Sequence, residues 1–288
     1  MPQNTRMVVP INSFMSWVGG KMRLRDSIVE RFPLGYEKYI EVFGGAAWVL
    51  FHKERTKFEV YNDFNTLLVN VFRQVRDKPE ELKAALKYQL CSRADFDLYR
   101  RELFELEVPM SEVERAAKYF NLIRNSYASG ITSFSCQPHD LWTDFPEIDA
   151  ANTRLRGVLI ENQSFDKLIP HYDSSGSFFY CDPPYCGTEG HYTSNFTRES
   201  HAKLAELLRG IKGKFLLSYN DCDEIRELYK WANIEEISRL DNIAQRVDPG
   251  RMYRELLISN YDTTLRRKQH EQTSLFATEN KQILMEAQ

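Results

Sequence analysis

The sequence lacks any long apolar run, and this absence first excludes membrane-spanning helices. No stretch of its 288 residues approaches the roughly 18 consecutive apolar residues that a membrane span requires. Residues 1–10 also lack an apolar run, so we expect no signal peptide. Internal repeats and low-complexity tracts are missing as well. These absences predict a globular protein with no membrane partner.

Cysteine is scarce, and its spacing excludes two common uses of this residue. The five cysteines are an odd number, and they follow neither a disulfide framework nor the paired CxxC hooks of zinc sites. We therefore expect no metal ion. Reduced thiols predict a cytoplasmic location, because disulfides persist in oxidising compartments.

A surplus of positive charge is missing too. The formal net charge is −3, which excludes a protein that binds nucleic acid through its overall field. Any such contact must come from a local basic face. Hydrophobic residues, by contrast, make up 42% of the chain, which is enough for a sizeable core. At this length we expect one large α/β domain, alone or carrying a smaller inserted one.

Short apolar segments alternate with amphipathic ones along the chain. Five β-rich stretches end at or just before glycine, carboxylate or amide residues: 39–43, 58–61, 177–181, 214–219 and 255–260. Apolar residues at helical spacing occur between them, at 65–76 and 202–208. This alternation predicts a doubly wound, mostly parallel α/β sheet of the Rossmann-like kind. Ligands of such sheets bind beyond the carboxyl ends of the strands.

Residues 78–170 break the alternation and predict an inserted, helix-rich second domain. Helical patterns at 80–90 and 112–123 precede a polar, turn-like run. We therefore assign 1–77 and 171–262 to the sheet domain and 263–288 to a polar tail. Taken singly, the basic residues of the insert are typical of a solvated helical face; they are Arg93, Arg100, Arg101, Arg115, Lys118 and Arg124.

Asp182-Pro183-Pro184-Tyr185 directly follows the buried stretch 177–181. Methylating an exocyclic amino group requires localising a lone pair that is delocalised into the base. The Asp182 carboxylate can accept one N–H, and the Pro183 carbonyl, stiffened by the Pro-Pro step, can accept the other. Tyr185 offers a flat face for a flipped base. The alternative interpretations are a proline-stiffened loop, or a ligand of proline-recognising domains, which usually lies in a disordered tail.

Two further motifs follow predicted strands. Small residues in Glu41-Val42-Phe43-Gly44-Gly45 let the backbone approach a cofactor closely, although tight turns use glycine widely. The G-x-G-x-x-G pattern of dinucleotide binders is absent. Asp63, after the next strand, is suited to ribose hydroxyls by analogy with nucleotide-binding sheets. Its alternative role is to cap the helix that begins near Asn65.

Trp17-Val18-Gly19-Gly20-Lys21 forms a glycine turn near the N-terminus. Its ammonium can pair with a carboxylate or a phosphate. It is not a P-loop, because neither serine nor threonine follows Lys21. A solvated lysine at a helix start is the alternative interpretation.

Taken in order, these motifs resemble the Dam-type DNA N6-adenine methyltransferases (D12 class, alpha group). The order is Trp-x-Gly-Gly-Lys, Glu-x-Phe-x-Gly, Asn-Asp-Phe-Asn, an insert and Asp-Pro-Pro-Tyr. Segments 192–197, 200–204 and 254–258 resemble the loop, helix and late strand that follow in the family. The resemblance covers residues 13–262. It implies a bacterial or phage-encoded enzyme that methylates adenine in double-stranded DNA with S-adenosyl-L-methionine.

The resemblance also implies roles for individual residues. We expect the target adenine to contact Asp182, Pro183, Pro184 and Tyr185. We expect the cofactor to contact Trp17, Lys21, Glu41, Phe43, Gly45, Asp63 and Asp182. The insert would recognise the DNA target, and the expected DNA contacts are Ser16, Arg124, Tyr127, Ser129, Ser133, Asn195 and Phe196. The loop that carries Asn195 and Phe196 is expected to close over the flipped base.

Two departures from the family pattern carry expectations of their own. Ala46-Ala47-Trp48 stands where the family often has a further glycine, which would tighten the site around the methionine moiety. Ser16 stands where GATC-reading members place a lysine, and the run 129–133 lacks their arginine. Because Arg and Lys read guanine edges and serine does so poorly, we expect a target other than GATC.

Other functions stay open at this point. The nearest alternative is an amino-methyltransferase acting on cytosine N4, on RNA or on a glutamine side chain, although the Asp form of the motif favours adenine in DNA. A catalytically inactive DNA-binding protein is a second alternative. A nicotinamide dehydrogenase is a third, and the missing fingerprint disfavours it. The sequence decides neither the oligomeric state nor whether a partner restriction endonuclease exists.

Overall fold

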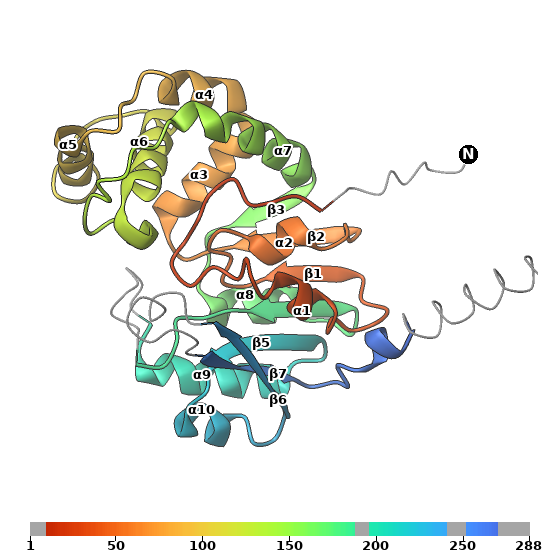
Figure 1. Ribbon diagram of the computed structural model, residues 1–288. Coiled ribbons are helices and arrows are strands. Elements are labelled where there is room, and N and C mark those ends of the chain that lie inside the picture. The colour runs from red at the N-terminus through yellow and green to blue at the C-terminus, as the bar shows by residue number, and fades with distance from the viewer. Residues whose placement is uncertain (1–9, 188–195, 241–251, 270–288) are drawn as a thin grey trace, which may run out of the picture.

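The computed structural model describes residues 10–187, 196–240 and 252–269. Seven strands form one sheet in the order β3-β2-β1-β4-β5-β7-β6 (Figure 1). In chain order they are β1 (Lys38–Glu41), β2 (Phe58–Asn62), β3 (Val158–Glu161), β4 (Ser177–Cys181), β5 (Lys214–Asn220), β6 (Asn233–Leu240) and β7 (Met252–Ser259). Among these seven strands, β7 alone runs opposite in direction to the other six, which confirms the predicted, mostly parallel α/β fold.

The strand order reverses between β1 and β4, and this reversal positions the site. From β1 the chain moves outward to β2 and β3 and then returns to β4, which pairs with β1. Connections on the two sides of such a reversal leave the sheet on opposite faces, so a crevice opens at the carboxyl ends of the two central strands. Glu41 ends β1 and Asp182 follows β4, so both residues lie at this crevice.

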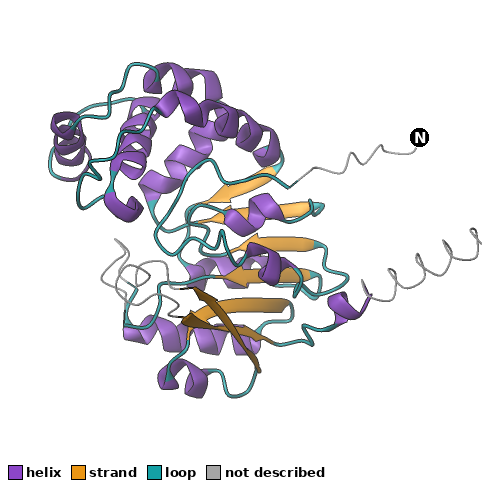
Figure 2. Cartoon of the chain, in the orientation of Figure 1, coloured by secondary structure: helices purple, strands orange, loops and turns teal. Residues whose placement is uncertain are grey.

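Helices cover both faces of the sheet (Figure 2). One face carries α1 (Arg25–Val29), α2 (Trp48–His52) and α3 (Thr66–Asp77), and the other carries α8 (Phe165–Tyr172), α9 (Arg198–Gly210) and α10 (Asp223–Leu228). Strand β4 shows the reason, because successive side chains point to opposite faces. Phe178 and Tyr180 belong to one apolar core, and Phe179 and Cys181 belong to the other.

A group of helices stands beside one end of the sheet, between α3 and β3 (Figure 1). Its elements are α4 (Pro79–Leu86), α5 (Arg93–Phe104), α6 (Glu112–Asn125), the short 3-10 helices η1 (Tyr127–Ser129) and η2 (Leu141–Asp144), and α7 (Phe145–Leu155). Serine caps begin two of them, since Ser92 accepts from the Asp95 amide and Ser111 from the Glu114 amide. This insert shares its apolar core with α3, so it is anchored to the sheet domain.

The sheet differs from the sequence prediction at its two edge strands. Strand β3 lies inside the predicted insert 78–170, yet it pairs with β2, so the sheet resumes at Val158. Strand β6 was not predicted. Both strands are partly exposed, with Leu159 44% exposed and Glu235 and Glu236 on β6. Strand β6 mixes charged residues with apolar ones, as an edge strand can. Strand β3 has the short apolar run Val158-Leu159-Ile160, but this run lies inside the segment assigned to the insert.

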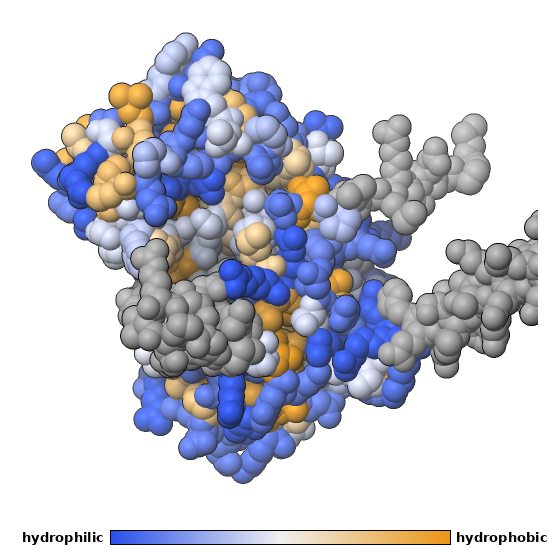
Figure 3. Space-filling view, in the orientation of Figure 1, coloured by the Kyte–Doolittle hydropathy of each residue, from blue (hydrophilic) through white to orange (hydrophobic). Residues whose placement is uncertain are grey.

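The first residues of the predicted polar tail contact the folded protein. Arg266 donates hydrogen bonds to the carbonyls of Phe32 and Pro33. Residues 270–288 lie outside the described part of the chain. Within the described ranges, no helix is long and apolar enough to cross a membrane. The face seen in Figure 3 is largely hydrophilic, with scattered hydrophobic patches.

Candidate active site

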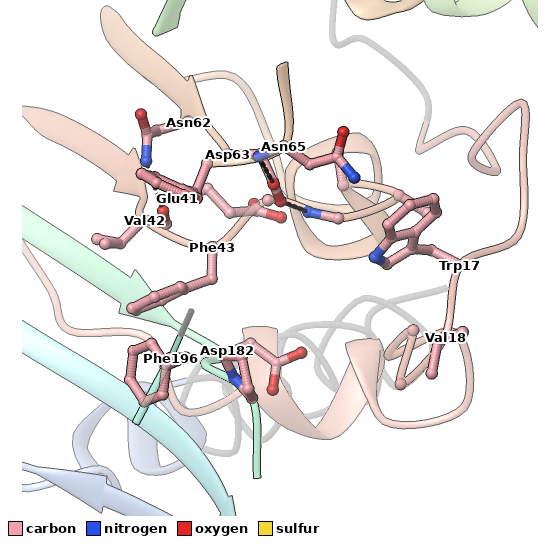
Figure 4. Close-up of a pocket in the computed structure, with 18 of the residues that line it drawn as sticks. Trp17, Val18, Glu41, Val42, Phe43, Asn62, Asp63, Asn65, Asp182 and Phe196 are labelled. Carbon is pink, nitrogen blue, oxygen red and sulfur yellow. Dashed lines mark hydrogen bonds between the residues drawn. The ribbon is translucent and has the colours of Figure 1, made fainter. Parts of the chain in front are cut away.

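A cavity of about 510 Å³ lies at the carboxyl ends of β1, β2 and β4. Its walls come from segments far apart in the sequence. They include all seven predicted cofactor residues: Trp17, Lys21, Glu41, Phe43, Gly45, Asp63 and Asp182. Figure 4 shows Trp17 on one side, Phe43 and Phe196 opposite, and the carboxylates of Asp63 and Asp182 between them.

The glycine turn after β1 is shaped by close packing. A Cβ on Gly44 would lie 2.2 Å from the Tyr61 ring, so no larger residue fits there. Gly45 has φ +48° and Ala47 has φ +55°, both in the left-handed region. Ala47 is one of the residues that stand where the family often has a further glycine, and its backbone keeps the conformation that glycine favours.

Asp63 fixes this turn. Its Oδ2 accepts from the Gly45 amide at 2.9 Å, and its Oδ1 accepts from the Asn65 amide at 2.8 Å (Figure 4). The capping role considered for Asp63 belongs to Asn65, whose side chain accepts from the Leu68 amide and begins α3. Burial raises the pKa of Asp63, and the amide hydrogen bonds oppose this rise. The carboxylate lines the cavity, and the amides of Gly45 and Asn65 hold it in place.

Asp182 is held from two sides. Lys21 donates to Oδ2 at 2.8 Å and lies 2.7 Å from Oδ1, while Ser218 on β5 donates to Oδ1 at 2.8 Å. Burial raises the pKa of Asp182, although Lys21 and Ser218 lower it. Lys21 is only 6% exposed, and it also donates to the Gly19 carbonyl. The interpretation of Lys21 as a solvated lysine is therefore wrong.

Glu41 is buried at the end of β1 and faces the same cavity. The Tyr39 hydroxyl donates to its Oε2 at 2.6 Å. Burial raises the pKa of Glu41 to about 8, despite the Tyr39 hydrogen bond and the charge of Lys53. In the free protein this carboxyl is therefore largely protonated at neutral pH, and a cationic group beside it would favour its ionised form.

The rest of the Asp-Pro-Pro-Tyr segment turns from the cavity toward β7. Pro184 lines the cavity, whereas Pro183 is buried and is not among the lining residues. The Tyr185 hydroxyl donates to Glu255 at 2.7 Å, its ring lies 6.0 Å from that of Tyr219, and the Lys21 ammonium is 4.8 Å from its centroid. Tyr185 is not among the residues that line the cavity. Its contact with a flipped base stays a prediction.

Three phenylalanines form an aromatic wall on one side of the cavity. The ring of Phe196 lies 5.7 Å from that of Phe43 and 5.6 Å from that of Phe165. Phe196 is only 8% exposed and is packed into the core, whereas we expected it on a closing loop. Asn195, its predicted partner in that loop, lies outside the described residues. Phe196 is therefore part of the cavity wall, and its role in closing over a base stays a prediction.

The insert contributes a loop to the same cavity. Residues 129–132 line it, and Ser129 exchanges a 2.7 Å hydrogen bond with Ser16, the residue before Trp17. Ala128, Ser129 and Ile131 have φ of 51°, 58° and 59°, which strains residues other than glycine. The structure thus brings two predicted DNA contacts, Ser16 and Ser129, into contact with each other.

The other predicted DNA contacts are dispersed over the insert. Arg124 donates to both carboxylate oxygens of Asp144, at 2.5 and 3.0 Å, and so ties α6 to η2. Tyr127 is 66% exposed, and its amide donates to the carbonyl of Ser133, whose side chain is exposed. Their contact with DNA stays a prediction.

Several residues of the site were missed by the sequence reasoning. Two are Ser218 and Glu255, which bind the Asp-Pro-Pro-Tyr segment from β5 and β7. Glu255 directly precedes the apolar run Leu256-Leu257-Ile258, and nothing in this local pattern indicates that it meets Tyr185. Phe165, Arg100 and Tyr119 also line the cavity, and their sequence context gives no signal either. Among the described residues, no group of three or more His, Cys, Asp or Glu side chains could hold a metal ion.

Comparison of the sequence with known proteins identifies similar methyltransferases. A family model described as D12 class N6 adenine-specific DNA methyltransferase matches residues 17–243. The type II methyltransferase M1.LlaDCHI of Lactococcus lactis subsp. cremoris is 27% identical over 277 residues, covering 88% of this chain and 96% of the relative. The DNA adenine methylase of Escherichia coli (strain K12) is 24% identical, covering 85% and 94%. The type II methyltransferase M.MjaIII of Methanocaldococcus jannaschii is 26% identical, covering 87% and 99%.

Proposed function

This chain belongs to the D12 class N6 adenine-specific DNA methyltransferase family, and on that premise we propose its reaction. It transfers a methyl group from S-adenosyl-L-methionine to the N6 amino group of an adenine flipped out of double-stranded DNA. The observation that carries this proposal is the Asp182 carboxylate, fixed by Lys21 and Ser218 at the wall of a cavity large enough for a cofactor.

The residues around the cavity fit S-adenosyl-L-methionine. The aromatic wall of Phe43, Phe165 and Phe196 would pack against its adenosine part. Asp63 would accept hydrogen bonds from ribose hydroxyls, as acids at this position do in nucleotide-binding sheets. Glu41, buried and hydrogen-bonded to the neutral Tyr39 hydroxyl, would favour a positively charged group of the ligand. When bound, the cofactor supplies a methyl group on a positively charged sulfur.

The chain's own groups would prepare the amino group of adenine. Asp182 would accept one N6 hydrogen bond, and the Pro183 carbonyl would accept the other. Both acceptors pull the nitrogen toward tetrahedral geometry and localise its lone pair. Because Lys21 and Ser218 fix the orientation of Asp182, little reorganisation is needed as positive charge develops on the nitrogen.

The proposal is tested by incubating the purified protein with methyl-labelled S-adenosyl-L-methionine and unmodified duplex DNA. We expect label in DNA and, after digestion to nucleosides, only N6-methyladenine. N4-methylcytosine would identify the alternative reaction, and label in RNA alone would exclude DNA as the substrate. A lack of label in any DNA, with an active reference enzyme beside it, would favour a DNA-binding protein without catalysis.

We further propose that the target differs from GATC. Ser16 stands where GATC-reading members of the family place a lysine, and its hydroxyl is hydrogen-bonded to that of Ser129. Serine cannot make the bidentate contact by which Arg reads guanine. DNA from a methylation-free host that expresses the protein should therefore remain cleavable by endonucleases blocked by GATC methylation. Long-read sequencing of the same DNA should report the modified site, and complete protection at GATC would contradict the proposal.

The insert is proposed as the domain that recognises this target. Its loop 129–132 reaches the cavity, so sequence reading and base binding would occur side by side. Replacing Thr132 by alanine should alter the range of modified sites more than the affinity for the cofactor. An unchanged site together with weaker cofactor binding would assign the loop to the cofactor instead.

A further inference from the structure

Three polar side chains on β5 and β7 hold the segment that follows β4. Ser218 donates to the Asp182 carboxylate. Asn220 forms two hydrogen bonds with the main chain of Cys186, accepting from its amide and donating to its carbonyl, both at 3.1 Å. Glu255 accepts from the Tyr185 hydroxyl at 2.7 Å. The segment from Asp182 to Cys186 is thus fixed at three points, one of them at its tyrosine.

Sheet register explains how the three reach the same segment. On β5, Leu216 and Ser218 alternate with Leu217 and Tyr219, so Ser218 and Asn220 share one face. Asn220 pairs with Glu255, and Ser218 pairs with Leu257. Leu216 and Leu257 both belong to the core on the side of α1 to α3. The polar side chains therefore continue that face toward the crevice, directly beside the residues after β4.

A buried glutamate at position 255 is unfavourable for the stability of the fold. It is 1% exposed and precedes the buried run Leu256-Leu257-Ile258. A buried carboxylate stabilises a fold less than an apolar residue of similar size would. Its charge also opposes that of Asp182, whose pKa it helps to raise. A buried carboxylate at this position therefore points to a role beyond stability.

The geometry of Tyr185 identifies that role. Burial raises the pKa of Tyr185 well above its ordinary value, and the charges of Asp182 and Glu255 add to the effect, so its hydroxyl keeps its proton and donates. The Lys21 ammonium lies against the same ring, 4.8 Å from its centroid. The ring is therefore held by Glu255 at its hydroxyl and by Lys21 at its side.

We propose that Glu255 is a positioning residue for the methyl-transfer reaction, which acts by fixing the Tyr185 ring for contact with the target base. This role rests on the proposed function, because it presupposes that a flipped adenine meets Tyr185. Asn220 supports the same arrangement through Cys186. Glu255 itself touches neither adenine nor cofactor in this role.

The test compares Glu255→Leu, which removes the acceptor, with Glu255→Gln, which keeps an acceptor oxygen without the charge. We expect the single-turnover methylation rate of Glu255→Leu to fall about 10- to 100-fold, the range for a lost hydrogen bond to a charged group. Glu255→Gln should recover most of that loss. Cofactor affinity, measured by calorimetry, should stay unchanged in both.

A double-mutant cycle assigns the effect to Tyr185. Tyr185→Phe should lose about as much rate as Glu255→Leu, and the double variant should be no slower than either. With 2-aminopurine in place of the target adenine in duplex DNA, the fluorescence of the bound complex should change in both single variants. Tyr229→Phe is the matched control, since that buried hydroxyl makes no hydrogen bond within the described residues. It should behave like the wild type.

Several outcomes would overturn the positioning role while leaving the proposed function intact. They are a wild-type rate in Glu255→Leu, an equal loss in Glu255→Gln, or additive losses with Tyr185→Phe. A loss of rate matched by lost cofactor affinity and a lower melting temperature would assign Glu255 to the fold instead. If the wild-type protein itself transfers no label to DNA, the proposed function fails, and the positioning role fails with it.

Discussion

Glu59 on β2 and Glu41 on β1 are buried carboxylates on neighbouring strands, yet their surroundings differ. Glu59 accepts hydrogen bonds from Lys53 at 2.5 Å and from Arg154 at 2.6 and 2.9 Å. Burial alone would raise the pKa of Glu59, but the charges of Lys53 and Arg154 outweigh burial and lower it. Glu41 accepts from the neutral Tyr39 hydroxyl, and burial raises its pKa to about 8.

This difference separates a charge that holds the fold from a charge that faces a ligand site. Arg154 also donates to the Leu50 carbonyl, so the Glu59 cluster ties α7 and α2 to the sheet. Glu41, Asp63 and Asp182 all line the cavity, and burial raises the pKa of each. Perturbed carboxylates gathered in one cavity are typical of functional sites. The structural acid Glu59 is thus neutralised by two cations of the fold. Of the three site acids, Asp182 is paired with Lys21, whereas Glu41 and Asp63 accept hydrogen bonds from neutral donors within the described residues.

The largest effect is expected at Asp182. Asp182→Ala removes the proposed acceptor, so the single-turnover rate of label transfer should fall by about 10²- to 10³-fold or more. The variant also leaves the buried Lys21 ammonium without its carboxylate, so some stability is lost and the rate is compared per folded molecule. Circular dichroism and the melting temperature serve as the control. An unchanged rate would contradict the assignment of site acids and structural acids.

The next effect is expected in stability at Glu59. Glu59→Leu leaves Lys53 and Arg154 buried without their carboxylate, so the free energy of unfolding should fall by about 3–5 kcal/mol. Denaturant unfolding measures this change. The methylation rate per folded molecule should stay close to that of the wild type. If Glu59→Leu kept its stability but lost its methylation rate, Glu59 would belong to the ligand site and not to the fold.

Position at the end of an apolar strand decides which features could be predicted from the sequence. Asp63, Asp182 and the glycine turn were predicted because each follows an apolar strand, and the ends of parallel strands converge on one crevice. Strand β6 was missed because an edge strand can carry exposed and charged residues, and β3 was missed because its short apolar run lies inside the helix-rich segment 78–170. Ser218 and Glu255 were missed as site residues because their role depends on the register between β5 and β7, which no local pattern encodes.

The structural acid Glu59 was equally invisible in the sequence. Its partner Arg154 is 95 residues away, in a helix of the insert. Likewise, Ser16 and Ser129 were both predicted to meet DNA, but a sequence cannot reveal that they meet each other across 113 residues. Hydrogen bonds between polar groups far apart in the sequence therefore cannot be predicted from local sequence patterns.

A smaller effect is expected in the pH dependence of cofactor affinity. A cationic ligand favours ionised Glu41, so below pH about 8 binding must displace a proton from it. Affinity should therefore rise with pH and level off above about 8, with a slope of up to about tenfold per unit. Calorimetric titration at several pH values measures this slope, and Glu41→Gln should flatten it.

The stability of the free protein should change in the opposite direction over the same range. Because the folded-state pKa of Glu41 is raised, its contribution is fully present below the unfolded value and is lost as pH rises through about 8. Unfolding of the wild type and of Glu41→Gln measures the difference. A pH-independent difference between the two would show that Glu41 is paired like Glu59.

The smallest effect is expected at Ala47, whose backbone has a left-handed conformation in the turn after β1. A left-handed conformation costs a residue other than glycine about 1–2 kcal/mol, and Ala47 has φ +55°. Ala47→Gly relieves this strain but loses a buried methyl group and some chain rigidity, so stability should change by less than about 1 kcal/mol. Ala46→Gly is the matched control: it makes the same losses without relief and should cost about 1–2 kcal/mol. Equal costs in the two variants would mean that the turn stores no strain.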